Sequence, residues 1–155
     1  KMSYLTVISL TEAKLYLRVD DTLTEDDALI TLAINTALKH LEDQTYHIAF
    51  AREKTYFCRN GCRRIYDYPI NSVIFPAASV DASVRNLHTD YNIGTEGNLV
   101  LNVGYEDPLD YPDSLKNVAL EIIDLLYYAN ETDKTIKDLS VMSKMVINEF
   151  RRFLV

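Results

Sequence analysis

The 155-residue sequence contains four glycines, four prolines, two cysteines and no tryptophan. So few glycines make a phosphate-cradling loop hard to build, and neither a P-loop nor a dinucleotide-binding fingerprint occurs. No apolar run is long enough to cross a bilayer, so we expect no membrane partner. Because Lys1-Met2-Ser3 leads directly into a polar, strand-like segment, we expect no secretory leader.

Positive charge is also scarce, with 16 Lys and Arg against 23 Asp and Glu and a formal net charge of −7. Proteins that bind nucleic acids contact phosphates through a basic surface. The basic residues that cluster here are Arg59, Arg63 and Arg64 at a predicted turn, with Arg151 and Arg152 near the end. We therefore expect no tight or sequence-specific DNA binding. The acidic balance suits either a surface past which DNA slides or plain solubility.

Residues that catalyse reactions or bind metals are scattered. His40, His47 and His88 have no partner at the spacing of a metal site or proton relay. No G-x-S-x-G or H-E-x-x-H motif occurs. We predict no catalytic residue, no cofactor, no metal and no enzymatic activity. The alternative from another class is a small hydrolase that uses acidic groups near Asp20 and the Asp26-Asp27 pair.

The two cysteines flank Asn60-Gly61, a strong hairpin-turn signal. A two-residue loop would place the thiols on opposite faces. A three-residue loop, with Gly61 in the left-handed position, would place Cys58 opposite Cys62. One cysteine pair falls short of the four ligands of a structural zinc site. We favour reduced thiols, because a cytoplasmic protein gains little from a single disulfide.

Apolar periodicity predicts four helices in the outer parts of the chain. Ser9-Leu10-Thr11-Glu12 is a capping box that starts a helix over residues 10–17. Residues 24–27 open a second helix that ends near Asp43, with three acidic side chains at the positive end of the helix dipole. Pro112 starts a third helix over 113–130. A last helical segment follows within 134–155.

The second predicted helix is apolar on two sides. One stripe consists of Leu29, Leu32, Ala33, Thr36 and Ala37, and the other of Ile30, Ile34, Leu38 and Leu41. A helix with two apolar faces is either mostly buried or packs on a neighbouring subunit as well as on its own core. The small residues allow close approach of another helix.

Between residues 51 and 103 the pattern becomes strand-like. We predict strands at 54–57 and 64–68, flanking the Asn60-Gly61 turn, then at 71–75 and 98–103, with a weaker one at 83–87. The predicted fold is therefore a single α+β domain spanning 1–155: mainly helical, with about four helices in an irregular core and an inserted small antiparallel β region. The helical parts are 9–44 and 112–155, and the β-rich insertion is about 51–103.

Tyrosine is unusually abundant, with eleven residues. Tyrosine is frequent in protein interfaces because it combines a large apolar area with a polar tip, although it also favours strands. The last segment carries methionine and phenylalanine at helical spacing, which indicates either core packing or a helix that docks in a partner's groove. The resulting interface candidates are Tyr66, Tyr68, Tyr127, Tyr128, Met142, Met145, Phe150 and Phe153.

Five motifs follow one another in an order that resembles the head–tail connector proteins of tailed phages. An "lteak-hLrvd" helix is followed by an acidic helix start, a "yPi-sV" segment, a strand ending in Gly-Tyr before a proline-started helix, and an aromatic helix end. In this sequence they are residues 6–20, 25–34, 68–73, 103–116 and 127–131. The resemblance covers about residues 5–131, whereas 134–155 has no strong match.

The resemblance implies a structural subunit of a ring of twelve copies. This ring would lie beneath the portal protein, extend the DNA channel and offer a docking surface to the next neck or tail protein. The subunit would be made in the cytoplasm of the host bacterium and reside in the neck of the virion. Alternatives are another neck component, such as a tail-completion protein, which is built on a different fold, and a generic binding module that docks through its last helix.

Overall fold

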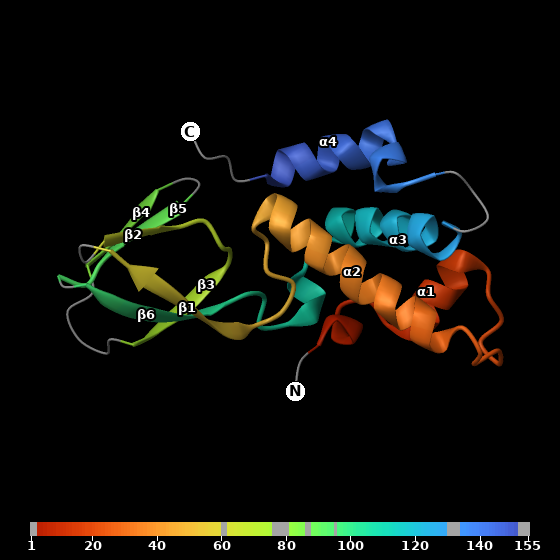
Figure 1. Ribbon diagram of the computed structural model, residues 1–155, viewed down its shortest axis with the longest axis horizontal. Helices are drawn as coiled ribbons and strands as arrows, with labels where there is room; N and C mark the ends of the chain where they lie inside the picture. The colour runs from red at the N-terminus through yellow and green to blue at the C-terminus, as the bar shows by residue number, and fades with distance from the viewer. Residues whose placement is uncertain are drawn as a thin grey trace.

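The computed structural model describes residues 3–59, 62–75, 81–85, 88–94, 96–129 and 134–151. A helical body occupies one side of the molecule and a β region the other (Figure 1). The body contains α1 (Leu10–Leu17), α2 (Asp27–Thr45), α3 (Asp113–Tyr127) and α4 (Val141–Phe150), with 3-10 turns η1 (Tyr4–Thr6), η2 (Pro108–Asp110) and η3 (Ile136–Asp138). The predicted α+β class, with four helices and small antiparallel sheets, is confirmed.

In the described part of the chain, two three-stranded antiparallel sheets form the β region. The strands are β1 (Arg52–Cys58), β2 (Cys62–Ile65), β3 (Ile70–Phe75), β4 (Asp81–Arg85), β5 (His88–Asn92) and β6 (Gly97–Val103). Their orders are β1-β6-β3 and β2-β5-β4. Along β6, Leu99, Leu101 and Val103 are buried while the residues between them are more exposed, as the two-residue period of a strand requires.

The predicted hairpin around Asn60-Gly61 differs from the structure. β1 pairs with β6 along its whole length, and β2 pairs with β5, so these two strands lie in different sheets. Asn60 and Gly61 themselves lie outside the described residues. Cys58 is buried and lies opposite Gly97. Because the side chain of Cys62 is not described, the state of the two thiols stays a prediction.

Several element boundaries also differ from the expected ones. Strand β2 ends at Ile65 instead of residue 68, because the chain turns away to pair the backbone of Tyr68 with that of His47. Strand β5 was not predicted: its sequence, HTDYN, has little apolar content. The weak strand at 83–87 is observed as β4, although residues 86 and 87 lie outside the described part. Helix α3 ends at Tyr127, three residues earlier than predicted.

The helical core forms where α2 packs against α1 and α3. The side chain of Ser9 caps α1 by accepting a hydrogen bond from the backbone N–H of Glu12, as predicted. One predicted stripe of α2 is fully buried against α3; it consists of Ile30, Ile34, Leu38 and Leu41. The other stripe is divided, because Ala33 and Ala37 are buried whereas Leu29 and Leu32 are exposed.

Glu42 joins the helical body to the β region. Its side chain, on α2, is almost completely buried and accepts hydrogen bonds from Tyr4 of η1, from the backbone N–H of Ala49 and from Arg52 of β1. Gly104 allows a second connection between the helical body and the β region. Its φ is 109°, and the backbone carbonyl oxygen of Phe50 leaves no room for a Cβ atom. The two parts are therefore held by a charged network and a close backbone approach.

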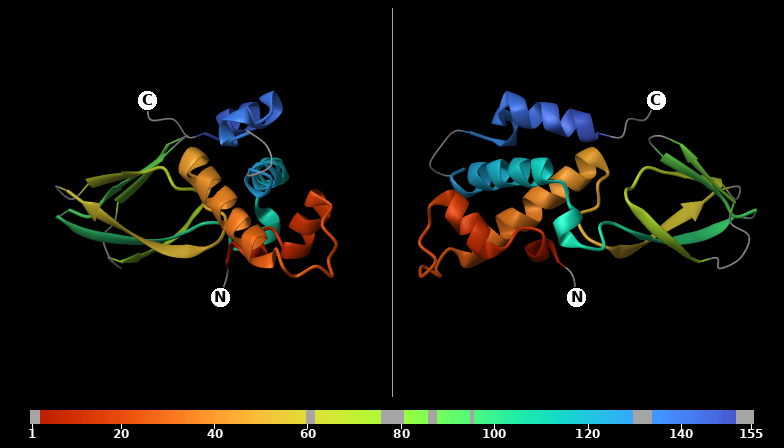
Figure 2. Two further views of the ribbon diagram at one scale, coloured as in Figure 1. Left: turned by 45° about the vertical axis from the view of Figure 1, so that its right-hand side comes forward. Right: turned by 180° about the vertical axis from the view of Figure 1, so that it is seen from behind.

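Helix α4 lies along α3 and α2, and its C-terminal end points toward the β region in both Figure 1 and the rear view of Figure 2. The loop between α1 and α2 lies at the opposite end of the molecule. No helix in the described part of the chain combines the length and the apolar character needed to span a bilayer.

Candidate assembly surfaces

Helix α4 has one buried and one exposed apolar face. Ser143 and Ile147 face the core, next to the buried Leu139. On the outer face, Val141 is 73%, Met142 71% and Met145 61% exposed. We call these three residues the α4 stripe. Such a row of large apolar side chains in solvent is typical of a protein contact.

Glu121 of α3 fixes the start of α4. Its carboxylate accepts hydrogen bonds from the backbone N–H of Ser140 at 2.5 Å, from the hydroxyl of Ser140 at 3.0 Å and from the hydroxyl of Ser143. Partial burial opposes ionisation, but these bonds outweigh it and lower the pKa of Glu121. The stripe is therefore presented by a helix with a defined position.

A second apolar surface lies between α2 and α3. A cavity of about 140 Å³ is lined by Leu29, Leu32, Ala33, Thr36 and Leu126. Leu126 also lines a neighbouring hollow of about 420 Å³, together with Leu125, Ala129 and residues 134–137. We call this pair of depressions the α2–α3 groove. Its most exposed large apolar residue, Leu32, is 62% exposed.

The edge strand β3 is a third exposed apolar surface. Val73, Ile74 and Phe75 are 36%, 40% and 57% exposed, and Phe57 of β1 is 52% exposed. The pairing of β3 with β6 has register shifts between residues 70 and 72 and between 73 and 75. Such irregularities weaken an edge strand as a template for pairing with another strand.

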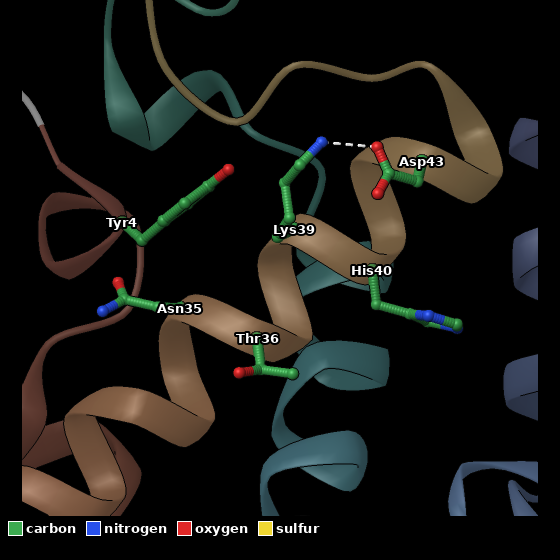
Figure 3. Close-up of a pocket in the computed structure, with 6 residues that line it drawn as sticks. All are labelled: Tyr4, Asn35, Thr36, Lys39, His40 and Asp43. Carbon is green, nitrogen blue, oxygen red and sulfur yellow. Dashed lines mark hydrogen bonds and ion pairs between the residues drawn. The ribbon is translucent and has the colours of Figure 1, made fainter.

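A polar hollow of about 480 Å³ lies between η1 and α2. Figure 3 shows its lining residues, of which Lys39 bonds to Asp43 at 2.5 Å while His40 points toward the other side of the helix. Tyr4 is engaged with Glu42. The polar groups of this hollow do not converge on one point, as a catalytic site would require.

The acidic residues considered for a hydrolase have structural partners. Asp20 accepts hydrogen bonds from the backbone and side chain of Thr22, Asp26 accepts one from Tyr127, and Asp27 forms an ion pair with Lys14. Of the three acidic residues expected at the start of α2, Asp27 lies in the first turn and Asp26 occupies the N-cap position without a capping hydrogen bond. Within the described ranges, no three His, Cys, Asp or Glu side chains are grouped as a metal site.

The predicted interface tyrosines of the β region lie near the junction with the helices. Tyr66 is half-buried, with its ring 5.7 Å from that of Tyr46 and 5.6 Å from that of His88. Tyr68 is 40% exposed, and its ring lies 5.1 Å from that of His47. Whether either contacts another subunit stays a prediction.

Tyr127 and Tyr128 are half-buried and hold elements of their own chain together. The hydroxyl of Tyr127 donates to Asp26 at 2.6 Å, and that of Tyr128 donates to the carbonyl of Leu17 at 3.2 Å. Their rings pack edge to face, with centroids 4.9 Å apart. These two tyrosines therefore tie the end of α3 to α1 and to the start of α2.

The candidates of the last helix divide between its two faces. Met142 and Met145 are exposed, whereas Phe150 packs on the core, with its ring edge to face against that of His47 and the ring centroids 5.2 Å apart. Phe153 lies outside the described residues. The structure adds Val141, which was not among the predicted candidates and is exposed in the first turn of α4. It also adds the groove at Leu126, which depends on tertiary packing and leaves no pattern in the sequence.

The chain thus combines an α+β fold, separate exposed apolar surfaces and acidic groups that are paired within the chain. The sequence matches no protein-family model and no curated protein. Its fold, however, is similar over its whole length to two solved structures. The first, described as the neck of an empty gene transfer agent (GTA) particle computed with C6 symmetry, has a TM-score of 0.75 at 12% identity, covering 100% of this chain and 95% of that one.

The second structure is the virion of a native GTA particle. It gives a TM-score of 0.75 at 13% identity, with coverage of 100% of this chain and 94% of the other. The resemblance to phage connector proteins is thereby confirmed at the level of the fold: this chain has the fold of a phage-like neck protein.

Proposed function

We propose that this protein is a structural subunit of the neck of a phage or phage-like particle, where copies form a ring between the portal protein and the tail or next neck protein. The observation that carries this proposal is the fold, which is similar to that of a neck structure across 100% of this chain and 95% of the other. Little remains of either chain outside the common fold. A structural role that depends on overall shape is therefore a better inference than one that depends on a few side chains.

The exposed surfaces support a ring. Subunits in a cyclic ring of more than two copies contact each other through two different patches, one on each side. This chain has distinct apolar patches on α4, on the α2–α3 groove and on β3. The neck structure with a similar fold was computed with six-fold symmetry, which is compatible with six copies or with the twelve that we propose.

The charge distribution supports a channel through which DNA passes without specific binding. Asp20, Asp21 and Glu25 are exposed in the segment between α1 and α2, and Figure 1 shows this segment at the end of the helical body remote from the β region. In the β region, Arg64 is paired with Asp90 at 3.0 Å. With a net charge of −7, the subunit would repel a DNA backbone that moves past it.

The test is deletion of the gene in the phage or prophage that encodes the protein. We expect DNA-filled heads and free tails by electron microscopy, and tailed particles again when the full chain is supplied in trans. Imaging the restored particles should place the protein in the neck. Normal tailed particles without the protein, or its location outside the neck, would disprove the proposal.

A Lys14→Met variant serves as a matched control for the complementation. Because Lys14 is only 3% exposed and pairs with Asp27 of its own chain, this variant changes no exposed side chain; it should restore tails at low temperature and lose that ability when it unfolds. This result separates loss of the fold from loss of the neck contact.

A further inference from the structure

We propose that the α4 stripe of one copy docks into the α2–α3 groove of the next copy and that this contact closes the ring. The inference rests on the proposed neck function and names the contact that this function requires. It predicts a partner of defined chemistry, namely a second copy of the same chain.

The two surfaces match in form. The stripe is convex, with Val141, Met142 and Met145 projecting from the outer side of a helix. The groove is concave and apolar, with Leu29 and Leu32 on one wall and Leu126 on the other. Methionine side chains are flexible and fill irregular apolar cavities well. An amphipathic helix laid into an apolar groove is a common mode of recognition.

The charges beside the two surfaces are opposite. Glu149 is exposed one turn after Met145, on the same side of α4. Lys134 and Lys137 are exposed and line the larger depression of the groove. Docking of the stripe would bring a carboxylate near two ammonium groups at the rim. Complementary rim charges favour the correct partner and register more than they add affinity.

A neighbouring copy must supply the stripe. The inner face of α4 packs on the helical core of its own chain through Ile147 and Phe150, whereas the stripe on its outer face stays exposed. A chain therefore cannot fill its groove with its own stripe. Each copy offers one stripe and one groove, which are two different patches, and two different patches are the condition for a head-to-tail ring.

Three double variants of the full chain test this contact. The stripe variant is Met142→Arg with Met145→Arg, and the groove variant is Leu29→Arg with Leu32→Arg. The control is Leu15→Arg with Leu109→Arg, which adds the same charge at residues that are 78% and 81% exposed outside both surfaces. Mass is measured by light scattering over a concentration series, and circular dichroism checks the fold. We expect self-association about 100-fold weaker in the first two variants and unchanged in the control.

Mixing the stripe and groove variants gives the sharper result. The groove variant retains an intact stripe and the stripe variant an intact groove, so the mixture should form dimers and nothing larger. The same variants are scored for tailed particles in the complementation assay, and both should fail where the control succeeds.

Rings or tailed particles formed by either variant alone would overturn the inference while leaving the neck function in place, because the ring would then close elsewhere. A mixture that stays monomeric would overturn it too. Failure of the wild-type chain to restore tails would instead disprove the proposed function itself.

Discussion

The ammonium group of Lys14, in α1, lies 2.5 Å from a carboxylate oxygen of Asp27, at the start of α2. The same Nζ donates hydrogen bonds to the backbone carbonyls of Leu23 at 2.6 Å and Asp21 at 3.3 Å. Lys14 is only 3% exposed, although lysine is rarely buried without partners. This one side chain therefore organises the loop between the first two helices.

Replacing Lys14 by methionine should lower the free energy of unfolding by about 2 kcal/mol, because the carbonyls and the Asp27 carboxylate lose their buried donor. Asp27 is partly exposed and regains some hydration, so the loss should be smaller than for a fully buried ion pair. Urea denaturation followed by circular dichroism measures the change.

Lys39→Met is the matched control. Lys39 also pairs with an aspartate, Asp43, at 2.5 Å, but both side chains are more than half exposed. Exposed pairs of this kind contribute about 0.5 kcal/mol or less. If the two substitutions lower the urea midpoint of unfolding equally, the burial of Lys14 does not determine how much Lys14 contributes to stability.

Tyr4 should make stability sensitive to alkaline pH. Its phenol donates to Glu42 in the junction between the helical body and the β region. Burial raises the pKa of Tyr4 from 10.0 to about 12. The hydrogen bond from Arg52 opposes this shift, and the negative charge of Glu42 reinforces it. The stabilisation is complete below pH 10 and decreases as the pH rises toward 12, because the unfolded chain then loses this proton first.

Measuring the free energy of unfolding against pH for the wild type and Tyr4→Phe tests this dependence. The variant should be less stable at neutral pH and should lose less stability above pH 10. Burial also raises the pKa values of Tyr56, Tyr91 and Tyr111, so some alkaline loss should persist in the variant. Two parallel pH profiles would contradict the role assigned to Tyr4.

The helices were predictable from sequence because their signals are local. Three signals each determine the structure of one or two helical turns. They are the cap at Ser9, the proline before α3 and the buried stripe of α2, which consists of Ile30, Ile34, Leu38 and Leu41. The pairing of strands was not predictable in the same way. The turn signal at Asn60-Gly61 is local, whereas the observed pairing of β1 with β6 and of β2 with β5 joins strands that lie far apart in the sequence.

The candidate surfaces were predictable only in part. Helical spacing placed Met142 and Met145 on one stripe with Phe150, but it could not tell which side of α4 faces the core. That choice depends on the Glu121 bonds to Ser140 and Ser143, which join residues about twenty positions apart. The second apolar face of α2 was predicted, yet the groove beside Leu126 required the position of α3.

Tyr127 should contribute to the fold of the single chain. Its hydroxyl donates to the Asp26 carboxylate at 2.6 Å, a charge-assisted bond between the end of α3 and the start of α2. Tyr127→Phe should lower the free energy of unfolding by about 1 kcal/mol. Its self-association at low temperature should match that of the wild type. A variant with normal stability and defective self-association would instead place Tyr127 in an interface.

The two faces of α4 should respond in opposite ways to truncation. Ile147 is 9% exposed and belongs to the helical core, so Ile147→Ala leaves a cavity and should cost about 2 kcal/mol of unfolding free energy. Met145 is 61% exposed on the same helix, and Met145→Ala should change this quantity by about 0.5 kcal/mol or less. Self-association should follow the reverse order, with the larger loss for Met145→Ala.

Denaturation and light scattering on the same two proteins give both quantities. Equal destabilisation by the two substitutions would mean that the outer face of α4 is packed against its own chain, and the α4 stripe would then not be available to a neighbouring copy.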